Sequence, residues 1–144
     1  MSLLNKKNVC FITGSRAEYG LLENIINLFR EDKSFKTFLI VTGSHLSKKF
    51  GTTINNISKK NVHIKKIPIN LNSDFKKLIY LNQKKLSQEI YKFYLEIKPT
   101  CFIVLGDRYE TLLCTSIAHF LNIPVIHIHG GEKTSGSKDD NYRH

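Results

Sequence analysis

Short apolar runs that end at glycine or polar residues recur along this chain, and a segment with helical periodicity separates each from the next. The runs cover residues 8–13, 35–41, 62–69, 101–105 and 125–129. Runs that are apolar at successive positions are typical of strands buried on both faces, which occur in parallel sheets covered by helices on either side. The alternation therefore predicts an α/β fold, a Rossmann-like three-layer sandwich whose parallel strands lie in the order 3-2-1-4-5.

The connecting segments predict the helices of that fold. Apolar residues that recur three and four positions apart indicate amphipathic helices with one buried face. We expect these helices from Tyr19 to Asp32, from Leu46 toward Lys60, from Ser73 to Pro99 and from Tyr109 to Leu121. The run 62–69 alternates apolar and polar residues, which indicates a strand near an edge of the sheet.

Composition narrows the class of protein. At 144 residues the chain fits one domain of ordinary size. Its net charge is +10, but most of the excess is lysine spread over residues 33–98, so we expect a solvated surface and no nucleic-acid partner. The three cysteines imply no disulfide framework, and no apolar stretch is long enough for a membrane span or a signal peptide. We expect a soluble, cytoplasmic protein with no membrane partner.

Charged residues follow the last two apolar runs. Asp107 and Arg108 come after the run that ends at Leu105, Glu132 follows the run at 125–129, and Asp139 lies beyond it. In open parallel sheets ligands bind at the carboxyl ends of the strands, where the loops converge. The three acidic residues therefore form a candidate acid/base cluster, although Asp107 could instead cap the helix that follows it.

The first turn, residues 13–20, is a second candidate site. It has neither the three-glycine dinucleotide fingerprint nor the Walker ending, so it indicates no NAD or ATP cradle. Gly14 leads into a helix start with Arg16 inside the turn, an arrangement that could bind an anion through backbone N–H groups and a guanidinium. The alternative is a tight turn with a surface arginine.

Two histidines and two glycines precede Glu132. His127 and His129 are two residues apart on a predicted strand and would share a face, so they could bind a metal, but no third ligand has clear spacing. A buried or hydrogen-bonding pair is the alternative, and we predict no metal site. Gly130 and Gly131 would let the backbone approach a ligand closely.

Four motifs in this order resemble the UDP-N-acetylglucosamine 2-epimerase family. They lie at residues 12–22, 41–47, 106–110 and 127–134, so the resemblance spans essentially the whole chain, and it is strongest to the hydrolysing branch. Enzymes of that branch form UDP and N-acetylmannosamine for sialic acid synthesis, or act on a related diacetamido sugar nucleotide on the way to legionaminic acid. The family fold is a GT-B-type pair of Rossmann-like domains that face a cleft.

The resemblance implies roles for particular residues. Residues 1–144 would be the N-terminal, sugar-side domain, with the C-terminal domain absent. Asp107, Glu132 and Asp139 would be the catalytic acids and bases, with the neighbouring Asp140 as the alternative to Asp139. Arg16 would lie on the phosphate side. The remaining substrate-binding positions would be Gly14, His45, Arg108, His129, Gly130, Gly131 and Arg143.

The chemistry that the resemblance implies explains why the site would need several carboxyl groups. A base removes the hydrogen at C2 of the sugar while UDP leaves C1, and the resulting glycal is protonated at C2 and hydrated at C1. Crowded carboxyl groups in a partly dry cleft have pKa values that are pushed apart, which supplies both an acid and a base. This route needs no redox cofactor and no catalytic metal.

The implied partners are a UDP-sugar substrate and the missing C-terminal domain or a full-length homologue, with a homodimer possible in the full-length form. Without the second domain we expect no activity, because the leaving group would lack its main binding half. The alternative is a catalytically silent module that binds an anion or sugar, or a truncated remnant.

Overall fold

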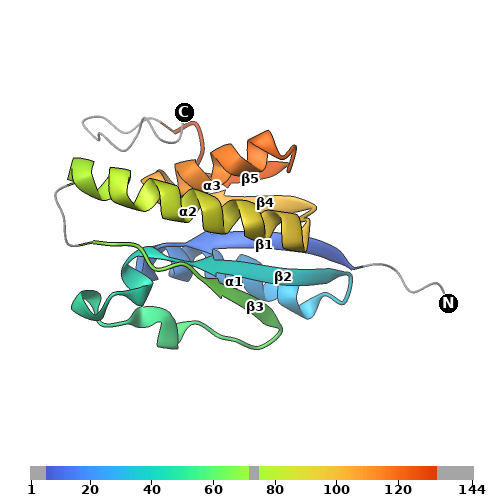
Figure 1. Cartoon of the computed structure of the whole chain (residues 1–144). Helices are drawn as coiled ribbons and strands as arrows, with labels where there is room; N and C mark the ends of the chain where they lie inside the picture. Colours follow the sequence, from blue (N-terminus) through green and yellow to red (C-terminus); the bar gives the residue numbers. More distant parts are fainter. Residues whose placement is uncertain (1–5, 72–74, 133–144) are drawn as a thin grey trace.

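The computed structural model describes residues 6–71 and 75–132. Five strands form one sheet, and every neighbouring pair is parallel. The strands are β1 (Lys7–Thr13), β2 (Phe35–Val41), β3 (Val62–Lys66), β4 (Cys101–Leu105) and β5 (Val125–Ile128). Their order across the sheet is β3-β2-β1-β4-β5, which confirms the predicted topology (Figure 1).

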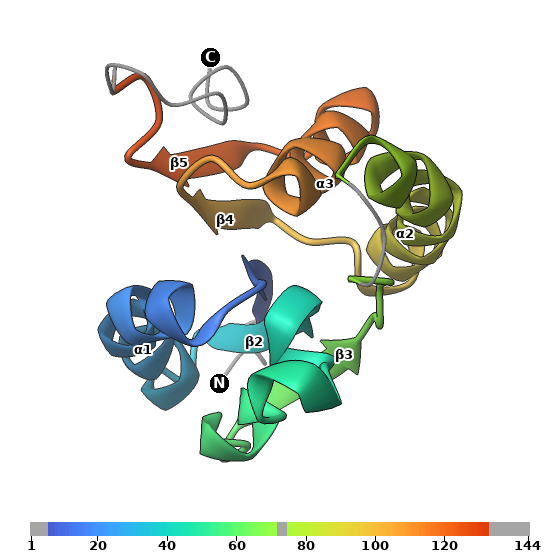
Figure 2. The ribbon, with the colours of Figure 1, turned by 90° about the vertical axis from the view of Figure 1, so that its left-hand side faces the viewer.

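Helices cover both faces of the sheet. These helices are α1 (Arg16–Glu31), α2 (Phe75–Ile97) and α3 (Tyr109–Phe120). Figure 2 shows α1 on one side of the strands and α2 with α3 on the other. The predicted cap of α2 at Ser73 and Asp74 lies outside the described residues. None of the helices in the described ranges has the length and apolar character that a membrane span requires.

The side chains of β1 alternate between two apolar cores. Cys10 and Ile12 pack with residues of α2 and α3, whereas Val9 and Phe11 pack with residues of α1. All four are buried, because β1 lies in the middle of the sheet with helices on both sides. This two-sided burial is the physical reason for the continuous apolar run, and each such side chain contributes roughly 1.5–3 kcal/mol when it leaves water.

The helix predicted from Leu46 toward Lys60 is wrong. The chain forms three short 3-10 helices there instead, η1 (Gly43–Leu46), η2 (Lys48–Phe50) and η3 (Thr53–Asn56). Gly51 and Thr52 have φ values of +83° and +48°, which lie outside the right-handed helical region and interrupt any longer helix. Ile54 nevertheless remains buried against the α1 side of the sheet, so the apolar spacing reported the burial but not the helix type.

Two other boundaries differ from the prediction. β3 ends at Lys66 and not at Ile69, because Ile67 still donates to Val41 O (2.9 Å) but Pro68 has no N–H to extend the ladder. The first helix begins at Arg16, three residues before the predicted start at Tyr19, because Ser15 caps it. The first difference lengthens the loop after β3, and the second shortens the turn between β1 and α1, both at the carboxyl edge of the sheet.

Candidate functional site

The turn between β1 and α1 is held by its own helix and by the neighbouring turn. Ser15 Oγ accepts from the amide of Glu18 (3.4 Å), and the Glu18 carboxylate accepts from the amide of Gly14 (2.8 Å), which is a capping box extended by one residue. On the other side, Gly14 O accepts from the amide (2.8 Å) and the hydroxyl (3.0 Å) of Ser44. The Gly14 peptide is therefore bonded on both sides and is buried.

Gly43 permits this close contact between the two turns. Its φ is +59°, and a Cβ placed on it would lie 2.5 Å from Gly14 O. At that distance no side chain fits unless the backbone shifts. Only glycine combines that backbone conformation with that approach. The glycine after β2 is thus a packing requirement of the first turn.

His45 lies behind the two turns and is buried. Its Nε2 lies 3.0 Å from Thr13 Oγ1, and its Nδ1 lies 2.8 Å from Thr53 Oγ1. Burial lowers the pKa of His45, so the neutral imidazole is favoured. Because both ring nitrogens are occupied by hydroxyl groups, the structure places this predicted substrate-binding residue in a supporting position.

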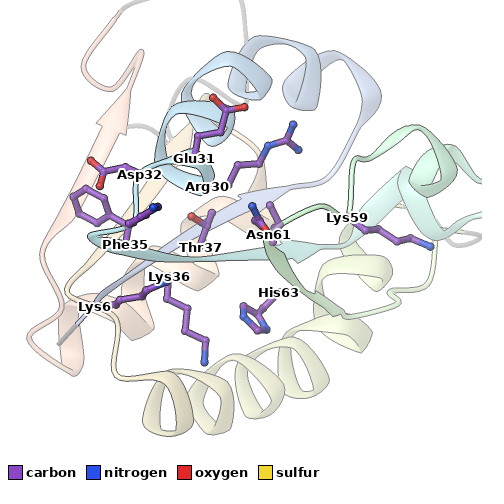
Figure 3. A pocket seen from close by; sticks show the side chains of 12 residues that line it. Lys6, Arg30, Glu31, Asp32, Phe35, Lys36, Thr37, Lys59, Asn61 and His63 are labelled. Carbon is purple, nitrogen blue, oxygen red and sulfur yellow. The ribbon is translucent and has the colours of Figure 1, made fainter. Parts of the chain in front are cut away.

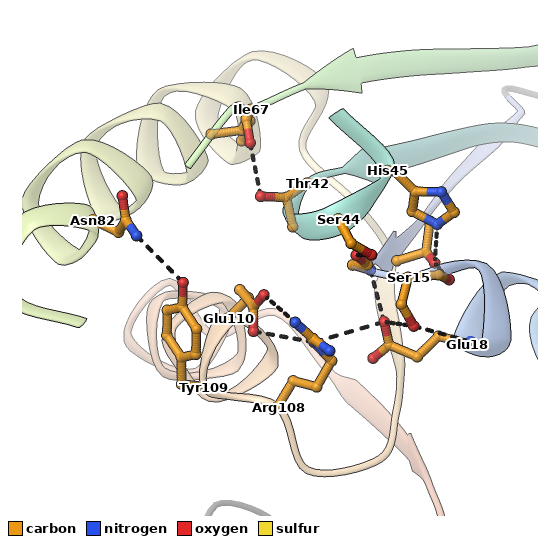
Figure 4. A network of polar contacts seen from close by, with 12 residues as sticks. Ser15, Glu18, Thr42, Ser44, His45, Ile67, Asn82, Arg108, Tyr109 and Glu110 are labelled. Atoms are coloured by element: carbon orange, nitrogen blue, oxygen red, sulfur yellow. Dashed lines mark hydrogen bonds and ion pairs between the residues drawn. The ribbon is translucent and has the colours of Figure 1, made fainter. Parts of the chain in front are cut away.

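An ion-pair network joins the start of α3 to the first turn (Figure 4). Arg108 donates to both carboxylate oxygens of Glu110, at 2.9 Å from Nη2 and 3.3 Å from Nε, and its Nε also lies 3.9 Å from Glu18 Oε2. Glu110 is only 1% exposed. A bidentate guanidinium is the geometry that best compensates a buried carboxylate. Arg108, predicted to bind substrate, is thus engaged by two carboxylates within the domain.

The network also sets the ionisation of its members. Burial raises the pKa of Glu18, and the opposing effects of Arg108 and of the Gly14 amide are weaker. Burial acts to lower the pKa of Arg108, but the hydrogen bonds and charge of Glu110 outweigh it, and the pKa of Arg108 is raised. Arg108 therefore stays charged, and Glu18 takes up a proton more readily than a solvated glutamate does.

Asn82 of α2 links the segment after β3 to the start of α3. Asn82 Oδ1 accepts from the amide of Asn70 (2.8 Å), and its Nδ2 donates to Asn70 O (2.7 Å) and, at 3.4 Å, to Tyr109 Oη. Burial, followed by the charge of Glu110, raises the pKa of Tyr109 to about 12. The phenol is therefore a neutral, positioned group beside the Arg108 network.

Two histidines make the polar contacts at the end of β5. His127 Nε2 donates to Gly106 O (2.6 Å), while His129 has a φ of +57° and its Nδ1 lies 2.8 Å from Glu132 Oε1. The side chains of His129 and Glu132 are 54% and 61% exposed. A Cβ on Gly130 would lie 2.6 Å from His127 Cγ, so a glycine is needed where the backbone passes the ring.

The two histidines do not act as a pair. β5 ends at Ile128, so the alternation that would place both rings on one face stops before His129, and each ring has its own partner. Across residues 6–71 and 75–132, no group of three or more His, Cys, Asp or Glu side chains is placed to hold a metal ion.

The predicted site residues that are described gather at one edge of the sheet. Gly14, Asp107 and Glu132 follow β1, β4 and β5, which are adjacent and parallel. Arg16 is exposed in the first turn of α1, and within the described part of the chain its guanidinium has no ion-pair partner. Asp139, its neighbour Asp140 and Arg143 lie outside the described residues.

The first turn differs in one respect from the expected anion cradle. The Gly14 amide already donates to Glu18, so it is not available to a ligand. The amides of Arg16 and Ala17, in the first turn of α1, are the ones that a helix leaves without a partner of its own. An anion at this turn would therefore meet the Arg16 side chain and the start of the helix.

Sequence reasoning missed two carboxylates of this edge. Glu18 could have been found, because Ser15 and Glu18 have the three-residue spacing of a capping box. Glu110 carries no such signal, since an acidic residue in the first turn of a helix is ordinary and is usually solvated. Its burial depends on Arg108 and on the packing of α3, which only the folded chain brings together.

Comparison with known proteins identifies the family. A family model described as UDP-N-acetylglucosamine 2-epimerase matches residues 27–144. A hydrolysing GDP/UDP-N,N'-diacetylbacillosamine 2-epimerase of Campylobacter jejuni is 36% identical over 98% of this chain, and a hydrolysing UDP-N,N'-diacetylbacillosamine 2-epimerase of Legionella pneumophila is 33% identical over 96%. The chain spans 37% of the length of each of these two relatives.

Solved structures share the fold. The UDP-GlcNAc 2-epimerase of Neisseria meningitidis, solved with UDP-GlcNAc bound, aligns with a TM-score of 0.75 at 18% identity. The alignment covers 94% of this chain and 37% of that one. The strand order, the edge that gathers the polar residues and the match of the family model agree, and this chain belongs to the UDP-N-acetylglucosamine 2-epimerase family.

Proposed function

We propose that this chain is the N-terminal, sugar-side domain of a hydrolysing UDP-sugar 2-epimerase that releases UDP and N-acetylmannosamine or the corresponding diacetamido sugar. The observation that carries the proposal is the convergence of the first turn, Asp107 and Glu132 at the carboxyl ends of three adjacent strands. The hydrolysing enzymes of Campylobacter and Legionella support the reaction class. The entry of the product into sialic or legionaminic acid synthesis and the cytoplasmic location stay predictions.

The described residues divide into a charged rim and a rigid support. Arg16, exposed and without an ion pair among the described residues, would meet the diphosphate of the sugar nucleotide. Asp107, half-buried after β4, and Glu132, on the exposed turn after β5, would exchange protons with C2 and with water at C1, together with Asp139. The Arg108–Glu110–Glu18 network would hold the turn that carries Arg16 in place.

The second domain explains why we expect no turnover from this chain alone. In our proposal it binds the uridine and the diphosphate, so the leaving group would otherwise depart into water from an open edge. Glu132 and its partner His129 are more than half exposed, and electrostatic stabilisation of developing charge is weak in such a wet site. A homodimer of the full-length protein belongs to the same proposal.

The test follows UDP-N-acetylglucosamine and UDP-N,N'-diacetylbacillosamine by proton NMR in deuterated water. The chain is incubated alone and then with a separately expressed C-terminal domain from a full-length relative. We expect no turnover alone. With the added domain we expect release of UDP and a product that carries deuterium at C2, because the base exchanges its proton with solvent before the glycal is reprotonated.

Single substitutions test the proposed roles of Asp107 and Glu132 in proton transfer. Asp107→Asn and Glu132→Gln should each lower the rate of the reconstituted pair by a factor of at least about 100, the usual contribution of a general acid or base. The matched control is Glu89→Gln, which removes from α2 a carboxylate that pairs with Lys65, away from the candidate site. Failure of the folded chain to react with either substrate even after the C-terminal domain is added, while a full-length relative reacts, would favour the silent-module alternative.

A further inference from the structure

A hollow lies at the edge of the sheet where the strands begin, opposite the candidate functional site (Figure 3). Its volume is about 530 Å³, which is within the range of small-molecule pockets. The end of α1, the start of β2 and the segment before β3 form its walls. β1 and β2 are seven residues long and separate the two edges by roughly 20 Å, so this pocket is distinct from the candidate active site.

The pocket is rich in positive charge. Five of its lining residues are cationic, and two are acidic. The cationic residues are Lys6, Arg30, Lys33, Lys36 and Lys59. Of the two acidic residues, Glu31 and Asp32, the second already accepts a hydrogen bond from the Ser34 amide (2.8 Å). A concave surface with this excess of cations concentrates anions from solution.

Two polar atoms in the wall have no hydrogen-bond partner among the described residues. Thr37 is 1% exposed and its Oγ1 is unpaired, and Arg30 Nη1 is buried and unpaired as well. Buried polar atoms without a partner are rare in native proteins and each calls for an explanation. A hydroxyl and a guanidinium N–H are both donors, so one ligand rich in acceptor oxygens would satisfy the two together.

The two unpaired groups lie on the same side of the sheet. In Figure 3 the side chains of Thr37 and Arg30 are on the α1 side of β2, whereas Lys36 and His63 lie on the other side. The contacts agree, because Lys36 Nζ lies 5.3 Å from the ring centroid of Phe38 and His63 stacks on that ring. Lys59 and Asn61 come from the segment that closes the pocket before β3.

We propose that this pocket binds a small phosphorylated anion. Its phosphate oxygens accept from Thr37 Oγ1 and from the Arg30 guanidinium, and Lys59 supplies a further positive charge. The planar guanidinium and the hydroxyl match the tetrahedral oxygens of a phosphate group, and charge-assisted bonds of this kind are the stronger class of hydrogen bond. The proposal does not depend on the proposed epimerase function, because it concerns the other edge of the sheet.

The test is an NMR titration of the ¹⁵N-labelled chain with sodium pyrophosphate in 150 mM NaCl, a salt concentration that screens weak surface attraction. We expect saturable shifts of the Thr37 and Asn61 amides and of the Arg30 side-chain N–H, with a Kd below about 1 mM. Thr37→Val removes the hydroxyl and keeps the shape, and should weaken binding at least about threefold. Arg30→Gln should weaken it about tenfold or more.

The matched control is Lys84→Gln, which removes a positive charge from the exposed surface of α2, away from this pocket. It should leave the Kd unchanged, and the amide spectrum of every variant reports whether the fold is intact. Shifts that do not saturate, or equal weakening by Lys84→Gln and Arg30→Gln, would overturn the proposal. Shifts confined to residues 14–18 would also overturn it, because they would place the anion at the candidate active site instead.

Discussion

The turns after β1 and after β5 lie at the same edge of the sheet, yet they are held in different ways. Gly14 is buried, and its peptide is bonded to Glu18 on one side and to Ser44 on the other. Glu132 is 61% exposed, and its described partner is His129, which is itself exposed and has a left-handed backbone. The turn after β1 is held by contacts within the domain, whereas the turn after β5 lies exposed at its surface.

This contrast divides the polar residues at this edge into those that hold the first turn in place and those that are exposed. Glu110 and His45 are buried, the side chain of Glu18 is 14% exposed, and all three bond to groups within the domain around the first turn. Arg16 and Glu132 are exposed, and they are the groups that meet the ligand in our proposal. Substitutions of the groups bonded within the domain should therefore change its stability. Substitutions of the exposed groups should change only the reaction that we propose.

The largest effect is expected from Gly43→Ala. A Cβ there meets Gly14 O at 2.5 Å and forces a side chain into the left-handed region at φ +59°, so the free energy of unfolding should fall by about 3 kcal/mol. Urea denaturation measures the change. Gly20→Ala is the control, because nothing lies within 4 Å of its Cβ and a helix interior favours alanine by roughly 0.5–1 kcal/mol. Equal effects of the two substitutions would break the comparison.

Glu110→Gln should have the next largest effect. The change removes the charge that Arg108 pairs with and leaves a guanidinium with only a distant carboxylate, so we expect a loss of about 2 kcal/mol in unfolding free energy. Glu89→Gln removes the partner of Lys65 from a pair whose members are about one third exposed, and it should change the unfolding free energy much less than Glu110→Gln does. A Gly14 amide resonance that stays in place in Glu110→Gln would contradict the proposed link between α3 and the first turn.

His45 should make stability depend on pH. Its pKa is lowered by burial below the ordinary value of 6.5, so the unfolded chain takes up the proton first as the pH falls. The stability that His45 provides is thus fully present above pH 6.5 and declines as the pH drops from there toward the lowered pKa of the folded state.

The measurement compares the unfolding free energies of the natural chain and His45→Asn between pH 7.5 and pH 5. The natural chain should lose more stability over this interval. The raised pKa of Glu18 acts in the opposite sense, since its contribution declines as the pH rises, but it is present in both proteins and cancels in the difference. Parallel curves for the two proteins would show that His45 is not the source.

The smallest effect on stability is expected from Glu132→Gln. The side chain is exposed and bonds only to an exposed histidine among its described contacts, so the unfolding free energy should change by less than about 0.5 kcal/mol. A larger loss in urea denaturation would show that the turn after β5 supports the domain, and it would remove the contrast with the first turn.

Much of this edge could be predicted from the sequence. The apolar runs gave the strands and their order, because a strand buried on both faces must be apolar at successive positions. The glycines and charges that follow these runs indicated which loops carry the site. The helix expected after Leu46 could not be excluded, since the spacing of Ile54 and Ile57 reflects burial on one side and does not distinguish an α-helix from successive 3-10 turns.

The sequence by itself determined the layers, the strand order and the family, because periodicity and local motifs are properties of neighbouring residues. The tertiary structure decided which charged residues are buried and which are free. Glu110 and Arg108 are two residues apart and look like any solvated pair, yet Glu110 is buried and Arg108 is paired with it. Burial and partnership depend on elements distant in the chain, and therefore only the folded molecule shows that Arg108 is paired with a buried carboxylate while Arg16 is exposed.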